Sequence, residues 1–99
     1  MIAHAPTALE SFRLMRATPL SYGWRMFHRA NPTDPLPSPS LVYFAGSKPI
    51  ASGPNAGKDP GHVGILDMLN GKLVVYSDKT RAWSVAWGKR LCGCFVPLP

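Results

Sequence analysis

Gly61-His62-Val63-Gly64-Ile65, followed by Leu73-Val74-Val75-Tyr76, is the stretch around which the rest of the chain is organised. Val63 and Ile65 alternate with a histidine and a glycine, which is the two-residue period of a half-buried strand. The second segment is β-branched and aromatic and suits a neighbouring strand. Asn70-Gly71 lies between them, and both residues tolerate positive φ. The stretch therefore predicts a β-hairpin.

The length of the hairpin loop decides how His62 lies relative to Asp78. A three-residue loop with Gly71 in the left-handed conformation places the two residues directly opposite, whereas a two-residue loop puts them on opposite faces. A carboxylate bonded to one imidazole nitrogen fixes the tautomer and leaves the other nitrogen as a base. His62 is thus a candidate base and Asp78 its orienting residue. The alternative is a solvent-facing histidine and an ordinary turn aspartate.

Composition indicates one domain, residues 1–99, with 45% hydrophobic residues and a net charge of +6. The charge favours anionic partners, namely nucleic acid, acidic polymers or an anionic cell envelope. No apolar run approaches the roughly 20 residues that a bilayer-spanning helix needs. Residues 1–6 carry neither a charged segment nor an apolar one, so we expect no secretory signal and synthesis in the cytoplasm.

The two cysteines, Cys92 and Cys94, are predicted to point to the same face of a strand, since they are two residues apart. This close spacing disfavours a mutual disulfide. Two thiols are too few for a typical metal site. We expect both cysteines to be packing residues of a protein in a reducing compartment. We expect the protein to hold no metal or other cofactor.

Two N-terminal helices are expected. Thr7-Ala8-Leu9-Glu10 fits a capping box, and Pro19 should end the first helix. A second helix is predicted from about Ser21 to Arg29. Four arginines of these helices form either one basic patch or an ordinary solvated face: Arg13, Arg16, Arg25 and Arg29.

The remainder of the chain is expected to form strands and loops. Residues 31–40 carry prolines 32, 35, 37 and 39 and predict an extended connector. Residues 41–44 predict a central strand, residues 45–60 a loop that borders a cleft, and residues 90–96 a last strand. Two helices followed by about four strands indicate an α+β fold, with the helices packed on a small antiparallel sheet.

The order of these pieces resembles the NlpC/P60 and CHAP group of papain-like cell-wall hydrolases, closest to compact versions from phages of actinobacteria. The resemblance extends from about residue 8 to residue 97. The matching pieces are Phe12-Arg13, Pro19, Tyr22-Gly23-Trp24, Pro39 before Leu41-Val42-Tyr43-Phe44, Gly61-His62-Val63-Gly64-Ile65, Tyr76-Ser77-Asp78, Trp87, and Arg90-Leu91-Cys92-Gly93-Cys94-Phe95-Val96-Pro97.

The resemblance implies a papain-like fold and cleavage of amide bonds in peptidoglycan. In the family a cysteine thiolate at the start of the first helix attacks the carbonyl, a histidine acts as base, and a polar residue orients it. His62 matches the base and Asp78 the orienting residue, but Ala8 stands at the nucleophile position. Thr7, better explained as a helix cap, and Ser11, better explained as a helix-surface residue, are the hydroxyl alternatives.

Three hypotheses follow from the missing nucleophile. The first is a catalytically inactive domain that binds peptidoglycan or another anionic wall polymer, or that builds a larger assembly such as a phage particle. The second is an active hydrolase using Thr7, Ser11, Cys92 or Cys94. The third is a small basic protein that binds nucleic acid or an acidic protein surface.

Aromatic side chains are the candidate binding residues of this sequence, because aromatics are enriched in interface cores. They are Trp83, Trp87 and Tyr43. The alternative is that the two tryptophans cap the hydrophobic core.

Overall fold

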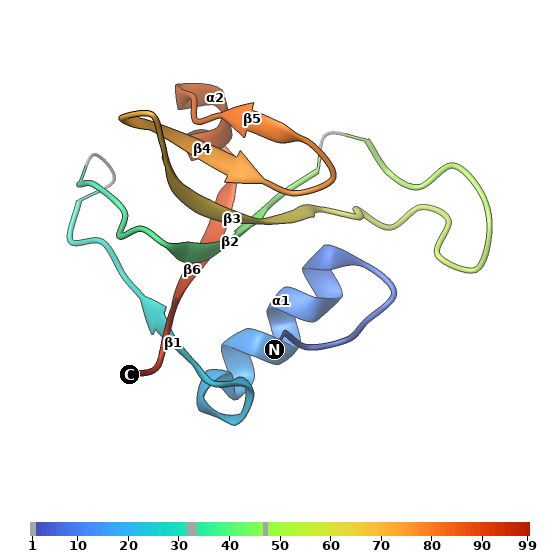
Figure 1. Cartoon of the computed structure of the whole chain (residues 1–99). Helices are drawn as coiled ribbons and strands as arrows, with labels where there is room; N and C mark the ends of the chain where they lie inside the picture. Colours follow the sequence, from blue (N-terminus) through green and yellow to red (C-terminus); the bar gives the residue numbers. More distant parts are fainter. Residues whose placement is uncertain (1, 32–33, 47) are drawn as a thin grey trace.

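The computed structural model describes residues 2–31, 34–46 and 48–99 and shows an α+β fold (Figure 1). One N-terminal helix lies against an antiparallel sheet with the strand order β1-β6-β2-β3-β4-β5. The elements are α1 (Ala8–Ala17), the 3₁₀-helix η1 (Pro19–Tyr22), β1 (Trp24–Phe27), β2 (Ser40–Phe44), β3 (His62–Leu69), β4 (Lys72–Tyr76), β5 (Thr80–Ala82), α2 (Val85–Lys89) and β6 (Leu91–Pro97). No helix in these described ranges is long and apolar enough to cross a membrane.

Side chains of β2 alternate between two hydrophobic cores, one on each face of the sheet. The core beneath α1 comprises Ala3, Phe12, Met15, Leu41, Tyr43 and Phe95. The core on the opposite face comprises Val42, Phe44, Leu66, Val75 and Cys94. Because strand residues alternate in direction, the central strand β2 contributes to both cores and is fully buried. The predicted central strand is confirmed.

Helix α1 begins as the sequence predicts. The Thr7 hydroxyl accepts a hydrogen bond from the Glu10 amide nitrogen at 3.2 Å. The carboxylate of Glu10 lies 3.0 Å from the Lys58 ammonium nitrogen. Thr7 is therefore a helix cap, and the ion pair of Glu10 ties the loop before β3 to the first turn of α1.

The predicted second helix from Ser21 to Arg29 is wrong. The chain forms only the short helix η1, and Gly23 at φ 84° ends it. The next residues form β1, which pairs with β6 from Trp24↔Pro97 to Phe27↔Cys94. Pairing with the free edge of β6 gives this aromatic segment backbone hydrogen bonds and a buried face, and both outweigh the helical spacing of its apolar residues.

The sheet has six strands rather than about four, and it includes β1 and the short β5, which the sequence did not predict. A second short helix, α2, lies between Trp83 and β6, and the Ser84 hydroxyl caps it by accepting from the Trp87 amide. The predicted connector is free of helix and strand from residue 34 to residue 39, whereas Pro32 lies outside the described residues.

The β3–β4 hairpin has the two-residue loop. Leu69 pairs with Lys72, and the loop residues Asn70 and Gly71 have φ values of 52° and 79°. Two successive positive φ angles are typical of the tight hairpin turn that Asn-Gly favours. The hairpin is confirmed, and its loop is the shorter of the two alternatives.

Strand β6 contains an irregularity beside β2. Tyr43 pairs with Gly93, but the next residue, Phe44, pairs with Leu91, so Cys92 is the extra residue of a β-bulge. Gly93 lies directly under α1, and a methyl group built on it would be 2.4 Å from a ring carbon of Phe12. The absence of a side chain at Gly93 therefore allows α1 to approach the sheet.

Replacing Gly93 with alanine should destabilise the fold by about 1–3 kcal/mol, because the buried Phe12 ring leaves no room for a methyl group. The measurement is the free energy of unfolding in urea. The matched control is Gly88→Ala in α2, where the added methyl would make an ordinary contact of 3.5 Å with Trp83. Equal stability of the two variants would contradict the close packing of α1 on β6.

Candidate functional site

The predicted base and the predicted nucleophile position lie on opposite faces of the sheet. Ala8 packs against the core beneath α1, and so does Val63. The neighbouring residue His62 points the other way, with its ring 5.9 Å from the Trp87 ring, which belongs to the opposite core. The structure therefore does not bring Ala8 and His62 into one site.

His62 and Asp78 do not form a pair either. Ile65 pairs with Tyr76, so the two-residue turn leaves His62 and Asp78 out of register. The Asp78 carboxylate instead accepts a hydrogen bond from the Ser77 hydroxyl at 3.0 Å and lies 3.9 Å from an Arg81 nitrogen. The Ser77 hydrogen bond, helped by Arg81, lowers the pKa of Asp78. Asp78 is an exposed turn carboxylate in this arrangement.

The expectation that Ser11 is a helix-surface residue is wrong. Ser11 is buried, its hydroxyl donates to the carbonyl oxygen of Ala3 at 2.7 Å, and it shares a second hydrogen bond of 2.7 Å with the Tyr43 hydroxyl. Tyr43, a predicted binding residue, is itself fully buried, and burial raises the pKa of its phenol. Ser11 and Tyr43 therefore form a polar link inside the core and present no binding surface.

The two tryptophans differ in what they contact. Trp87 lies edge-on to Phe44 at 4.6 Å between ring centroids, with Arg81 and Arg90 over its ring, so it packs between side chains. Trp83 also packs toward Phe44 but reaches a surface groove of about 540 Å³. The groove is lined by Arg29, Asp34, Pro35, Leu36, Leu66, Leu73, Trp83, Val85, Gly88 and Lys89. Trp83 is thus a predicted binding residue that borders a cavity.

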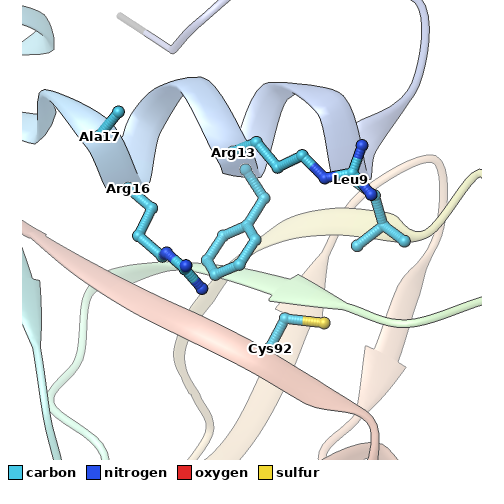
Figure 2. Close-up of a pocket in the computed structure, with 6 residues that line it drawn as sticks. Leu9, Arg13, Arg16, Ala17 and Cys92 are labelled. Carbon is cyan, nitrogen blue, oxygen red and sulfur yellow. The ribbon is translucent and has the colours of Figure 1, made fainter.

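A second cavity lies between α1 and β6, also with a volume of about 540 Å³ (Figure 2). It is lined by Leu9, Phe12, Arg13, Arg16, Ala17 and Cys92. Figure 2 shows the two arginine side chains leaving α1 and Cys92 opposite them on β6. We call this hollow the α1–β6 pocket. It combines two cations, an apolar wall and a thiol in one place.

The two cysteines point to different faces, contrary to the prediction. Cys94 is buried in the core opposite α1, while Cys92 is exposed and lines the α1–β6 pocket. The β-bulge explains the difference, because the extra residue breaks the alternation of β6. The sequence gives no sign of this pocket for the same reason, although it shows Arg13 and Arg16 as neighbours on one helix.

Partial burial, reinforced by the nearby Asp59 carboxylate, raises the pKa of the Cys92 thiol. Burial likewise raises the pKa of Cys94. A cysteine nucleophile needs the opposite shift, since the thiolate is the reactive form. The environment of both cysteines therefore favours the neutral thiol at neutral pH.

The four arginines do not form one basic patch. Arg13 and Arg16 line the α1–β6 pocket, whereas Arg29 lines the groove beside Trp83. Arg25 alternates with Trp24 and Met26, both of which pack beneath α1, so its side chain faces the other side of the sheet. The loop that precedes β3 does border a cavity of about 210 Å³, through Lys58 and Asp59.

Matches were sought among protein-family models, curated proteins and solved structures, and none was found. Over residues 2–31, 34–46 and 48–99, no group of three His, Cys, Asp or Glu side chains is placed to hold a metal ion.

Alkylation of Cys92 by iodoacetamide should have a pH midpoint above that of an unstructured cysteine peptide, because the raised pKa keeps the thiol protonated to higher pH. Cys94 should react only in denaturant, since it is buried. Mass spectrometry of the two peptides over a pH series measures both rates. A Cys92 midpoint below that of the peptide would instead indicate an activated thiolate and would favour a displaced nucleophile.

Proposed function

We propose that this chain is a catalytically inactive domain of the NlpC/P60, papain-like type that acts as a binding or structural module. The observation that carries the proposal is the placement of Ala8 and His62 on opposite faces of the sheet. A base must lie within about 2.6–3.2 Å of the group it deprotonates, or reach it through one water molecule. A residue at position 8 and a base at position 62 do not meet this condition.

The alternative nucleophiles are engaged or unactivated. The Thr7 hydroxyl caps α1, and the Ser11 hydroxyl is buried between Ala3 and Tyr43. The Cys92 thiol has a raised pKa, because partial burial and the nearby Asp59 carboxylate disfavour the thiolate. Hydroxyls and protonated thiols are weak nucleophiles without an adjacent base. These contacts support the inactive assignment.

The partner is proposed to be peptidoglycan or another anionic wall polymer, or the protein subunits of a larger assembly such as a phage particle. The net charge of +6 favours an anionic partner in each case. Nucleic acid is the weaker proposal, because the arginines are divided between the two faces of the sheet.

Neither the wild-type protein nor Ala8→Cys should release soluble peptides from purified bacterial cell wall, since a thiol at position 8 would have no imidazole beside it. The measurement is chromatography of the supernatant after incubation, with an active cell-wall hydrolase as positive control. Pelleting the same wall and assaying the protein in the pellet measures wall binding in parallel.

The matched variant is Ala17→Cys, which adds a thiol at the exposed end of α1, far from its N-terminus. Cleavage by the wild-type protein would overturn the inactive assignment. Cleavage by Ala8→Cys but not by Ala17→Cys would show that a base reaches position 8, and the geometry on which the proposal depends would be wrong.

A further inference from the structure

We propose that the α1–β6 pocket binds a small carboxylate carried on an apolar body, with Arg13 and Arg16 holding the carboxylate. The inference deepens the proposed function, on which it rests, because it gives the binding module a site and a ligand class. Three features of the pocket carry it: two arginines outside the ion pairs of the described residues, an apolar wall and the spacing of the two arginines.

Neither arginine of the pocket takes part in the ion pairs that the described residues form. The ion pairs Lys58–Glu10 and Arg81–Asp78 lie among the described residues, and neither involves Arg13 or Arg16. The carboxylates of Glu10 and Asp59 border a neighbouring cavity together with Arg13, and each of them has another partner. Glu10 pairs with Lys58, and one oxygen of Asp59 accepts from the amides of Gly46 and Gly61 at 2.9 Å each. Two exposed guanidinium groups therefore remain available to an anion.

The apolar part of the pocket suits a hydrocarbon body. Leu9, Phe12 and Ala17 contribute to its lining, and the Arg16 guanidinium lies 6.0 Å from the centre of the Phe12 ring. A cation held against an aromatic face keeps its edge free for hydrogen bonds. The volume of about 540 Å³ falls in the usual range for small-molecule sites. An anion without an apolar part would leave this wall unfilled.

The arginine spacing favours a carboxylate. Arg13 and Arg16 are three residues apart on α1, so their side chains leave neighbouring positions of the helix surface. Each planar guanidinium presents a fork of donors that matches the two oxygens of a carboxylate. Both side chains line the same pocket, Arg13 extending along α1 toward Leu9 and Arg16 pointing toward the sheet (Figure 2), and a carboxylate bound between them would receive hydrogen bonds from both.

The test compares 3-phenylpropionate with its neutral amide, 3-phenylpropionamide, by titration followed in two-dimensional NMR spectra of the full chain. We expect the carboxylate to bind with a Kd on the order of 1 mM, as suits a ligand of this size, with shifts centred on α1 and on Cys92. The amide should bind at least about fivefold more weakly, because it loses the charge-assisted hydrogen bonds. Equal binding of the two compounds, or no binding of the carboxylate, would overturn the proposal.

Arg13→Gln and Arg16→Gln should each raise the Kd for 3-phenylpropionate about fivefold or more. The matched control is Arg25→Gln, which removes the same charge from an exposed position on the other face of the sheet and should leave the Kd within about twofold. An equal loss in the control would mean that net charge attracts the ligand, and the proposal would fail. Equally tight binding of inorganic phosphate would also contradict the role of the apolar wall.

Cys92 supplies a second readout that does not depend on the arginine variants. Bound 3-phenylpropionate should slow alkylation of Cys92, which shares the pocket, whereas the amide at equal concentration should not. Unchanged alkylation at saturating carboxylate would place the ligand elsewhere and refute the site. Wall cleavage by the wild-type protein would end the inactive assignment without affecting these binding results, so the two proposals fail separately.

Discussion

The packing of Val63 beneath α1 is the contact on which the arrangement of the site depends. Residues along a strand alternate between faces, so the packing of the half-buried Val63 on the α1 side directs His62 to the opposite side. The pairing of β3 with fully buried β2, where Phe44 lies opposite His62, fixes the same direction. A shift of the β2–β3 register by one residue would exchange the faces on which the β3 side chains lie. Such a shift would expose Val63 and bury His62 against α1.

In β6, by contrast, the alternation of side chains is interrupted, and this interruption creates the α1–β6 pocket. The bulge in β6 turns Cys92 toward α1, while Cys94, two residues later, is buried in the opposite core. Next to the bulge, Gly93 lets the Phe12 ring approach the backbone of the strand. The closeness of α1 to β6 then places Arg13, Arg16 and Cys92 in the lining of one pocket (Figure 2). The same irregularity thus separates the cysteines and shapes the cavity.

Much of the fold follows from local patterns that the sequence displays directly. The Thr7 cap, the Asn70-Gly71 turn and the apolar strand at residues 41–44 are each determined by neighbouring residues, and all three are confirmed. Strand β1 was not predicted, because its partner β6 lies about 70 residues away and the helical spacing of its apolar residues is misleading. Non-local pairing overrode local preference there.

The candidate site was less predictable, since it depends on register and on an irregular strand. The sequence is compatible with a two-residue and a three-residue hairpin loop. Only the three-residue loop would place His62 opposite Asp78, and the structure has the two-residue loop. A β-bulge leaves little trace in a sequence, so nothing there indicated that Cys92 would join Arg13 and Arg16. Burial of Ser11 depended on the Tyr43 hydroxyl across the core, which is a contact between residues 32 positions apart.

Nuclear Overhauser effects from the His62 ring test the central claim most directly, because they report which side chains lie within about 5 Å of it. The structure predicts contacts with the Trp87 ring, whose centroid is 5.9 Å away, and none with the Ala8 methyl group. The Ala8 methyl should instead contact side chains of the core beneath α1. Contacts between the His62 ring and the Ala8 methyl, with none to Trp87, would contradict the account.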